Sequence, residues 1–108
     1  MIEIDLGRDR QGRIVSYRVC GHSGCGEAGS DVVCAAVSAL TQAPLLGLER
    51  HLKLALSYAV DEKDGILEVA LNSAPDALTE AVLETMYYAL KSVADQRPEY
   101  VRIHEHRR

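Results

Sequence analysis

Apolar and polar positions alternate in four short stretches of the chain, which is the pattern of half-buried β-strands. The stretches span residues 2–6, 15–20, 52–60 and 67–71. A turn at 9–12 separates the first two, and a turn at 61–65 that ends in Asp64-Gly65 separates the last two. Each pair is therefore predicted to form a β-hairpin.

Two longer stretches place apolar residues three and four positions apart, which predicts amphipathic helices. The first begins at Ser30 or Asp31, either of which can cap a helix. Pro44 is expected to kink or interrupt it, although 45–51 can continue the helix. The second opens around Pro75 and carries one apolar stripe over residues 77–93. A short edge strand is predicted at 100–104.

The predicted order is ββαββαβ, and it favours a single α+β domain over residues 1–108. In that fold an antiparallel sheet carries both helices on one face. The other sheet face then requires polar side chains or a partner. Tyr58 and the leucine-rich stretch 52–60 favour a homodimer.

Charge and hydropathy narrow the classes of function. The net charge of −4 argues against a protein that binds nucleic acid through a basic surface, so we expect that no direct nucleic-acid contact is required. We find no uninterrupted apolar run of the roughly 18–20 residues that span a membrane. Residues 1–5 lack the basic and apolar regions of a signal peptide. We therefore expect a cytoplasmic protein that does not enter the membrane.

A glycine-rich segment separates the second predicted strand from the first helix. Four of the nine residues in 21–29 are glycine, and so many glycines make regular structure entropically costly. We expect a mobile loop here. Its central residues are Ser23, Gly24, Cys25, Gly26, Glu27, Ala28 and Gly29.

Cys34 and His22 flank this loop and form a candidate nucleophile and base. Cys34 follows the predicted helix start, where unpaired backbone N–H groups and the helix dipole favour a thiolate. His22 can accept the thiol proton if the loop brings the two side chains together. Asp31 and Ser38 lie at i−3 and i+4 from Cys34, on the same helical face. Asp31 can orient the imidazole, and Ser38 can hydrogen-bond a substrate.

Other interpretations of the same residues remain open. A cysteine between apolar neighbours is commonly a small buried side chain. Cys20, His22, Cys25 and Cys34 also offer four possible zinc ligands, although Cys34 stands alone in an apolar helix. A domain without catalytic activity that binds the ribosome is a further alternative.

The motif from Gly21 to Ser38 resembles the signature of a known family of cysteine proteases. The sequence has Gly21-His22, a glycine-rich loop, and then Gly29-Ser30-Asp31-Val32-Val33-Cys34-Ala35-Ala36-Val37-Ser38. It is similar to the ribosomal-processing cysteine protease family, Prp. That signature has Gly-His, a glycine-rich loop and Gly-x-Asp-(Ile/Val)-Val-Cys-Ala-x-x-Ser.

The resemblance implies a bacterial homodimeric cysteine protease that needs neither cofactor nor metal. Its substrate would be a large-subunit ribosomal protein precursor, which loses an N-terminal extension. The catalytic pair would be Cys34 and His22, and Asp31 and Ser38 would support catalysis or contact the substrate. The loop 23–29 would be a mobile lid. Cys25 lies inside that lid, and a reversible disulfide with Cys34 is one hypothesis for its role.

Overall fold

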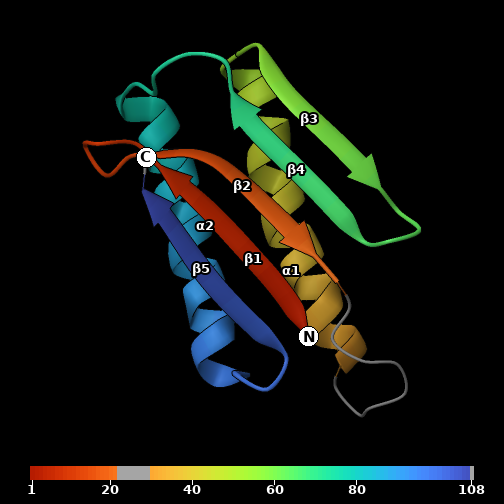
Figure 1. Cartoon of the computed structure of the whole chain (residues 1–108). Coiled ribbons are helices and arrows are strands. Elements are labelled where there is room, and N and C mark those ends of the chain that lie inside the picture. The colour runs from red at the N-terminus through yellow and green to blue at the C-terminus, as the bar shows by residue number, and fades with distance from the viewer. Residues whose placement is uncertain (22–29, 108) are drawn as a thin grey trace.

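The computed structural model describes residues 1–21 and 30–107. The described elements follow the predicted order ββαββαβ, with one additional turn of π-helix (Figure 1). They are β1 (Ile2–Arg8), β2 (Ile14–Cys20), α1 (Ser30–Leu46), η1 (Gly47–His51), β3 (Leu56–Asp61), β4 (Ile66–Leu71), α2 (Ala77–Gln96) and β5 (Val101–Arg107).

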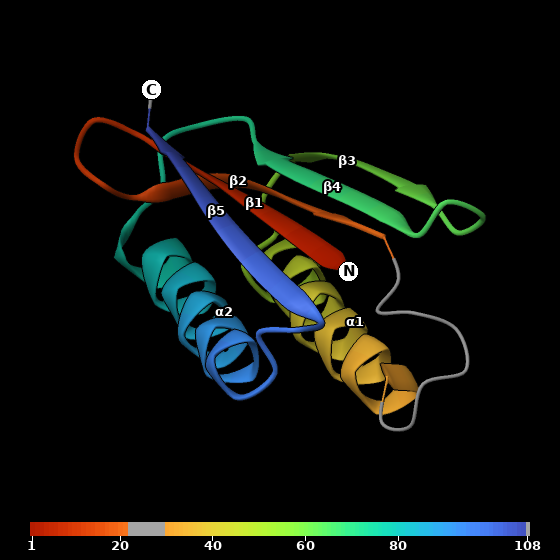
Figure 2. The same ribbon diagram turned by 60° about the horizontal axis from the view of Figure 1, so that its bottom comes forward.

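The five strands form one sheet in the order β3-β4-β2-β1-β5, and both helices lie on one of its faces (Figure 2). The pairs β1/β2, β2/β4 and β3/β4 are antiparallel, as the sequence predicted, but β5 is parallel to β1. The sheet is therefore mixed, not wholly antiparallel. The connection explains this, because β4 runs parallel to β1 and the crossover through α2 returns β5 in that same direction.

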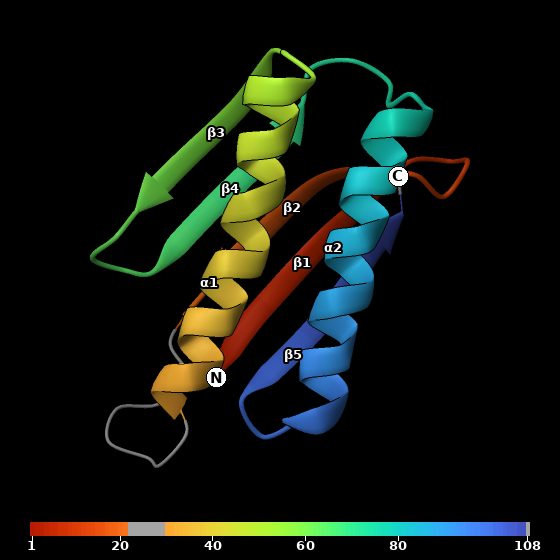
Figure 3. The same ribbon diagram turned by 180° about the vertical axis from the view of Figure 1, so that it is seen from behind.

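The hydrophobic core fills the space between the sheet and the two helices. Alternate residues of β1, Ile2, Ile4 and Leu6, are almost completely buried there. Figure 3 shows α1 and α2 side by side across the back of the sheet. Their buried apolar residues include Val33, Val37, Leu45 and Leu48 from α1 and η1, and Leu83, Met86 and Leu90 from α2.

The open face of the sheet, the one that carries no helix, is polar, which is one of the two possibilities that the sequence analysis gave for it. Ion pairs and hydrogen bonds connect neighbouring strands across it. The pairs are Arg18–Glu68, His104–Glu3 and His106–Asp5, with N–O distances of 2.8, 2.7 and 2.8 Å. This face can thus remain in water without a partner.

The end of the first helix and the start of the third strand differ from the sequence predictions. The helix does not stop at Pro44, which is buried inside α1, and the chain widens into a π-helical turn only after Leu46. Strand β3 begins at Leu56, not at 52. Residues 52–55 instead form a connection in which Lys53 has a positive φ of 54°. Their alternating leucines pack against the core from this connection.

The segment Asp31–His51 has the length and average composition of a membrane-spanning helix, although Ser38, Thr41 and Gln42 interrupt its apolar residues. It has 21 residues and a mean hydropathy of 1.5 over its best window, so by length and composition it is able to cross a membrane. In this fold it packs against the sheet through Val33, Val37, Thr41 and Leu48, which are buried.

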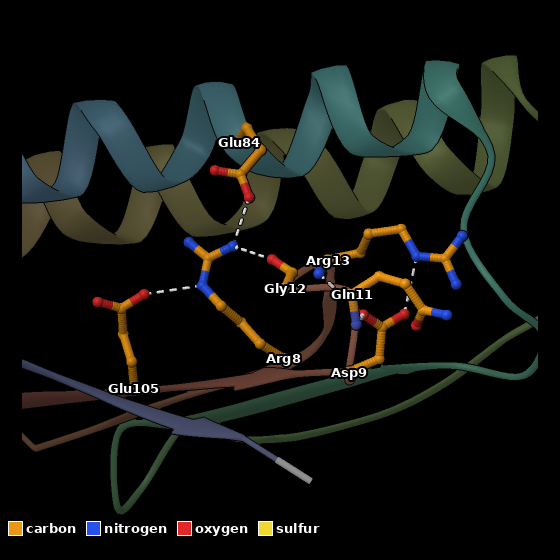
Figure 4. A network of polar contacts seen from close by, with 7 residues as sticks. All are labelled: Arg8, Asp9, Gln11, Gly12, Arg13, Glu84 and Glu105. Carbon is orange, nitrogen blue, oxygen red and sulfur yellow. Dashed lines mark hydrogen bonds and ion pairs between the residues drawn. The ribbon is translucent and has the colours of Figure 1, made fainter.

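Arg8 joins four parts of the fold at the end of β1 (Figure 4). Its Nε donates to Glu105 of β5 at 2.7 Å, and its Nη1 donates to Glu84 of α2 at 2.5 Å and to the carbonyl of Gly12 at 2.7 Å. Its guanidinium also lies 5.1 Å from the centre of the Tyr87 ring. Arg8 is 8% exposed, so these partners replace the water that it loses on folding.

We expect Arg8→Met to lower the free energy of unfolding by about 2 kcal/mol, because it leaves two carboxylates without their shared cation. Partial exposure of Glu84 and Glu105 keeps the loss below that of a fully buried pair. Urea unfolding at neutral pH measures the difference. The matched control is Arg18→Met, whose pair with Glu68 is exposed and should matter little. Equal effects of the two substitutions would contradict the prediction.

Candidate active site

A cavity of about 400 Å³ lies between the middle of α1, the start of β1, the end of β2 and the β3–β4 hairpin. Cys34 and Ser38 lie on its helix wall, so the structure brings these two predicted residues together at one site. The described residues that line it are Ile2, Val19, Gly21, Cys34, Ala35, Val37, Ser38, Thr41, Gln42, Val60, Asp61, Glu62, Gly65, Ile66 and Leu67.

Cys34 combines a place in the core with access to this cavity. It is half-buried and packs against the core cluster, yet it also lines the cavity. It lies in the second turn of α1, close to the unpaired N–H groups of the helix start. Asp31 is exposed in the first turn, and it is not among the described residues that line the cavity.

Ser38 and Gln42 continue the helix wall beyond Cys34. Both are exposed, and Nε2 of Gln42 donates to Oγ of Ser38 at 2.6 Å. Sequence reasoning identified Ser38 and missed Gln42. The spacing in the sequence could have identified Gln42, because it lies about two helical turns after Cys34, at i+8 on the same face.

Gly21 carries the chain from β2 to the position of His22. It lines the cavity, and it has a positive φ of 97°. A Cβ atom at this position would lie 2.6 Å from the carbonyl oxygen of Met1, so both the backbone angle and the close approach favour glycine. His22 and the predicted lid 23–29, with Cys25, lie outside the described residues.

The β3–β4 hairpin supplies the opposite wall, which sequence reasoning did not identify. Val60 and Ile66 give it an apolar surface, and Asp61 and Glu62 add two carboxylates where the hairpin turns. The hairpin reaches α1 only through the tertiary fold, because the rest of α1 and all of η1 separate it from Cys34 along the chain. No spacing rule within a single element identifies such a wall.

Cys20 does not join Cys34 at the site. Its neighbour Val19 is buried on the helix side of the sheet, so strand alternation places Cys20 on the open face. The sheet thus separates the two thiols. This geometry contradicts a zinc site that uses both of them, and the described residues contain no group of three metal-binding side chains.

The side chain of Tyr17 fixes the position of α1 relative to β2. Its hydroxyl donates to the Thr41 carbonyl at 2.7 Å, and Oγ1 of Thr41 donates to the Val37 carbonyl at 2.8 Å. Tyr17 is buried, and this burial raises the pKa of its phenol. Since Val37 and Thr41 line the cavity, Tyr17 sets the position of the helix wall that carries Cys34.

Comparison with known proteins finds a matching family model and matching solved structures. The family model described as cysteine protease Prp matches residues 1–102. SMU.848 from Streptococcus mutans has the same fold, with a TM-score of 0.89, 28% identity, and coverage of 100% of this chain and 96% of that one. No curated protein matches the chain.

Two solved structures of an essential ribosomal processing protease Prp from S. aureus also share the fold. One contains a substrate peptide, with a TM-score of 0.89 and 21% identity. The other contains a covalently linked product peptide, with a TM-score of 0.88 and 22% identity. Each comparison covers 97% of this chain and 99% of the S. aureus chain.

We expect Tyr17→Phe to lower the free energy of unfolding by about 1 kcal/mol, because the Thr41 carbonyl loses a buried donor. The folded state favours the neutral phenol. The contribution of the Tyr17 hydroxyl to the free energy of unfolding is therefore fully present below about pH 10. It is lost as the pH rises through the raised pKa of the phenol. Urea unfolding of both proteins over a pH series measures this. A constant difference at all alkaline pH values would contradict the prediction.

Gly21→Ala should lower the free energy of unfolding by about 1–3 kcal/mol, since alanine at a positive φ is strained and its Cβ approaches the Met1 carbonyl. The control is Gly47→Ala, where nothing lies within 4 Å of the added Cβ. That substitution should leave stability unchanged or raise it slightly. Thermal unfolding of the two variants tests the contrast, and equal losses would contradict it.

Proposed function

This chain belongs to the cysteine protease Prp family, and we propose that it removes the N-terminal extension of a large-subunit ribosomal protein precursor. It is a cysteine protease by that membership, which excludes a binding domain without catalysis. Within the proposal, Cys34 is the nucleophile and His22 is the general base. The observation that carries the assignment is the position of Cys34, which lies in the second turn of α1 and lines the cavity.

The proposed reaction proceeds through a thioester. His22 takes the thiol proton, and the Cys34 sulfur attacks the carbonyl carbon of the scissile peptide bond. The C–N bond then breaks, and the leaving amine takes the proton from His22. Water attacks the thioester carbonyl and gives a proton to His22, which returns it to the departing sulfur. Backbone N–H groups in the first turn of α1 are suited to stabilise the oxyanion.

The position of Gly21 supports the role of His22. Gly21 lines the same cavity as Cys34 and immediately precedes His22 in the chain. We propose that Asp31 orients the imidazole and that Ser38 hydrogen-bonds the bound peptide. The loop 23–29 is proposed to close over the substrate as a lid.

The S. aureus protein supports a peptide as the substrate. It is described as a ribosomal processing protease, and its structures contain a substrate peptide and a covalently linked product peptide. In this chain the cavity joins an apolar hairpin wall to a helix wall with polar groups. Such a cavity is suited to an extended peptide, because both its side chains and its backbone find partners there.

We propose a cytoplasmic homodimer as the working state. The net charge of −4 agrees with a protein that does not bind nucleic acid directly. Tyr58 of β3 is 51% exposed, which supports this edge of the sheet as the contact between the two copies.

Cys34→Ala should abolish cleavage of the purified precursor, with a loss on the order of 10³-fold or more. The assay follows removal of the extension by mass spectrometry. Cys20→Ala is the matched control, because Cys20 lies on the other face of the sheet, and it should keep its activity. Retained cleavage by Cys34→Ala would exclude Cys34 as the nucleophile.

Thiol labelling gives a second measurement that needs no substrate. Iodoacetamide should modify Cys34 faster than Cys20 if the helix start favours the thiolate. Peptide mapping of the labelled protein separates the two sites. Equal and slow labelling would argue against an activated nucleophile.

A further inference from the structure

Three residues on α1 face the cavity at regular intervals. Cys34, Ser38 and Gln42 are separated by four residues each, and all three line the cavity. One helical step of four residues advances about 6 Å along the axis. Two residues of an extended peptide advance about 6.7 Å, and their backbone groups then point in the same direction again. A peptide along this wall therefore presents an equivalent backbone group to each of the three side chains.

The cavity offers few side-chain donors to the carbonyl groups of such a peptide. The walls include Ile2, Val19, Val37 and Leu67, which provide none. Carboxylates on the hairpin wall are acceptors, and Asp61 already accepts the backbone N–H of Asp64 at 3.2 Å. Peptide carbonyls that enter a partly apolar cavity without a donor lose the hydrogen bonds that water made.

Donors are available on the helix wall at Ser38 and Gln42. Thr41 also lines the cavity, but its hydroxyl is engaged with the Val37 carbonyl at 2.8 Å. Gln42 has two N–H donors and one acceptor oxygen, and its bond to Ser38 uses one donor. Ser38 accepts in that bond, so its own hydrogen can be donated in another direction. The pair therefore retains donors that can bind a peptide.

We propose that Gln42 is a substrate-binding residue, which acts with Ser38 to donate hydrogen bonds to the backbone of the bound peptide. The inference rests on the proposed function, because it assigns a peptide to this cavity. The reacting carbonyl lies at Cys34, and the bonded backbone groups follow at intervals of two residues. Gln42 thereby extends the site by one helical turn beyond the residues that the sequence motif covers.

Equilibrium binding to the Cys34→Ala protein tests the proposal without cleavage. The probe is a fluorescent synthetic peptide that contains the precursor's extension and the first residues of the mature protein. Gln42→Ala and Gln42→Glu, each added to Cys34→Ala, should weaken binding about 3–10-fold, because each removes the N–H donors. The Glu variant keeps the length of the side chain. A loss of peptide affinity in this variant is therefore due to the missing N–H donors and not to lost packing.

The chain contains a matched control on α2. Gln96 is exposed and donates from Nε2 to Oγ of Ser92 at 3.2 Å, again over four residues, and it does not line the cavity. Gln96→Ala and Gln96→Glu should leave peptide affinity unchanged. In proteins that keep Cys34, Gln42→Ala should raise KM with little change in kcat, and its rate of iodoacetamide labelling should match the wild type.

The outcomes separate this inference from the proposed function. If the wild type does not cleave the precursor, both are overturned. If the wild type cleaves but the Gln42 variants bind the peptide within twofold of the reference, the proposed function stands and the inference is wrong. Full affinity in Gln42→Glu with a loss in Gln42→Ala would also overturn it, because size and not donation would then explain the effect.

Discussion

The packing of α1 against the centre of the sheet determines the geometry of the whole site. Val33, Val37 and Thr41 face the sheet and are buried, and the hydroxyl of Tyr17 holds the helix through the Thr41 carbonyl. A helix has only a limited buried face, so the remaining residues are available for function. Cys34 lies at the border of the two faces, which explains why it contacts both the core and the cavity.

Local sequence patterns predicted the elements of the fold, and the errors in these predictions have physical causes. Strand alternation predicted Ile2, Ile4 and Leu6 as core residues, and all three are buried. In β2 a shift of register opposite Gly7 and Arg8 puts Ile14 in the core and leaves Val15 half-buried. The parallel pairing of β5 depends on the direction in which α2 returns the chain, which periodicity does not encode.

The helix wall of the site could be predicted from the sequence, and the hairpin wall could not. A helix start and a spacing of four residues were enough to group Cys34 and Ser38, which line the cavity, whereas Asp31 is not among the described residues that line it. Val60 and Ile66 came to the cavity only through the pairing of β3, β4 and β2. The hairpin wall of the cavity therefore depends on tertiary structure, whereas the proposed nucleophile lies on one local segment.

The pairing between β1 and β5 has a consequence for the order in which the protein folds. Residues 101 positions apart meet across these strands, as His104 and Glu3 do. Strand β1 thus lacks one neighbour until the ribosome has synthesised β5, and Arg8 lacks Glu84 and Glu105 until α2 and β5 exist. Contacts over such distances along the chain slow folding. A protein proposed to mature a ribosomal component can therefore complete its own sheet only after nearly all of the described chain has been made.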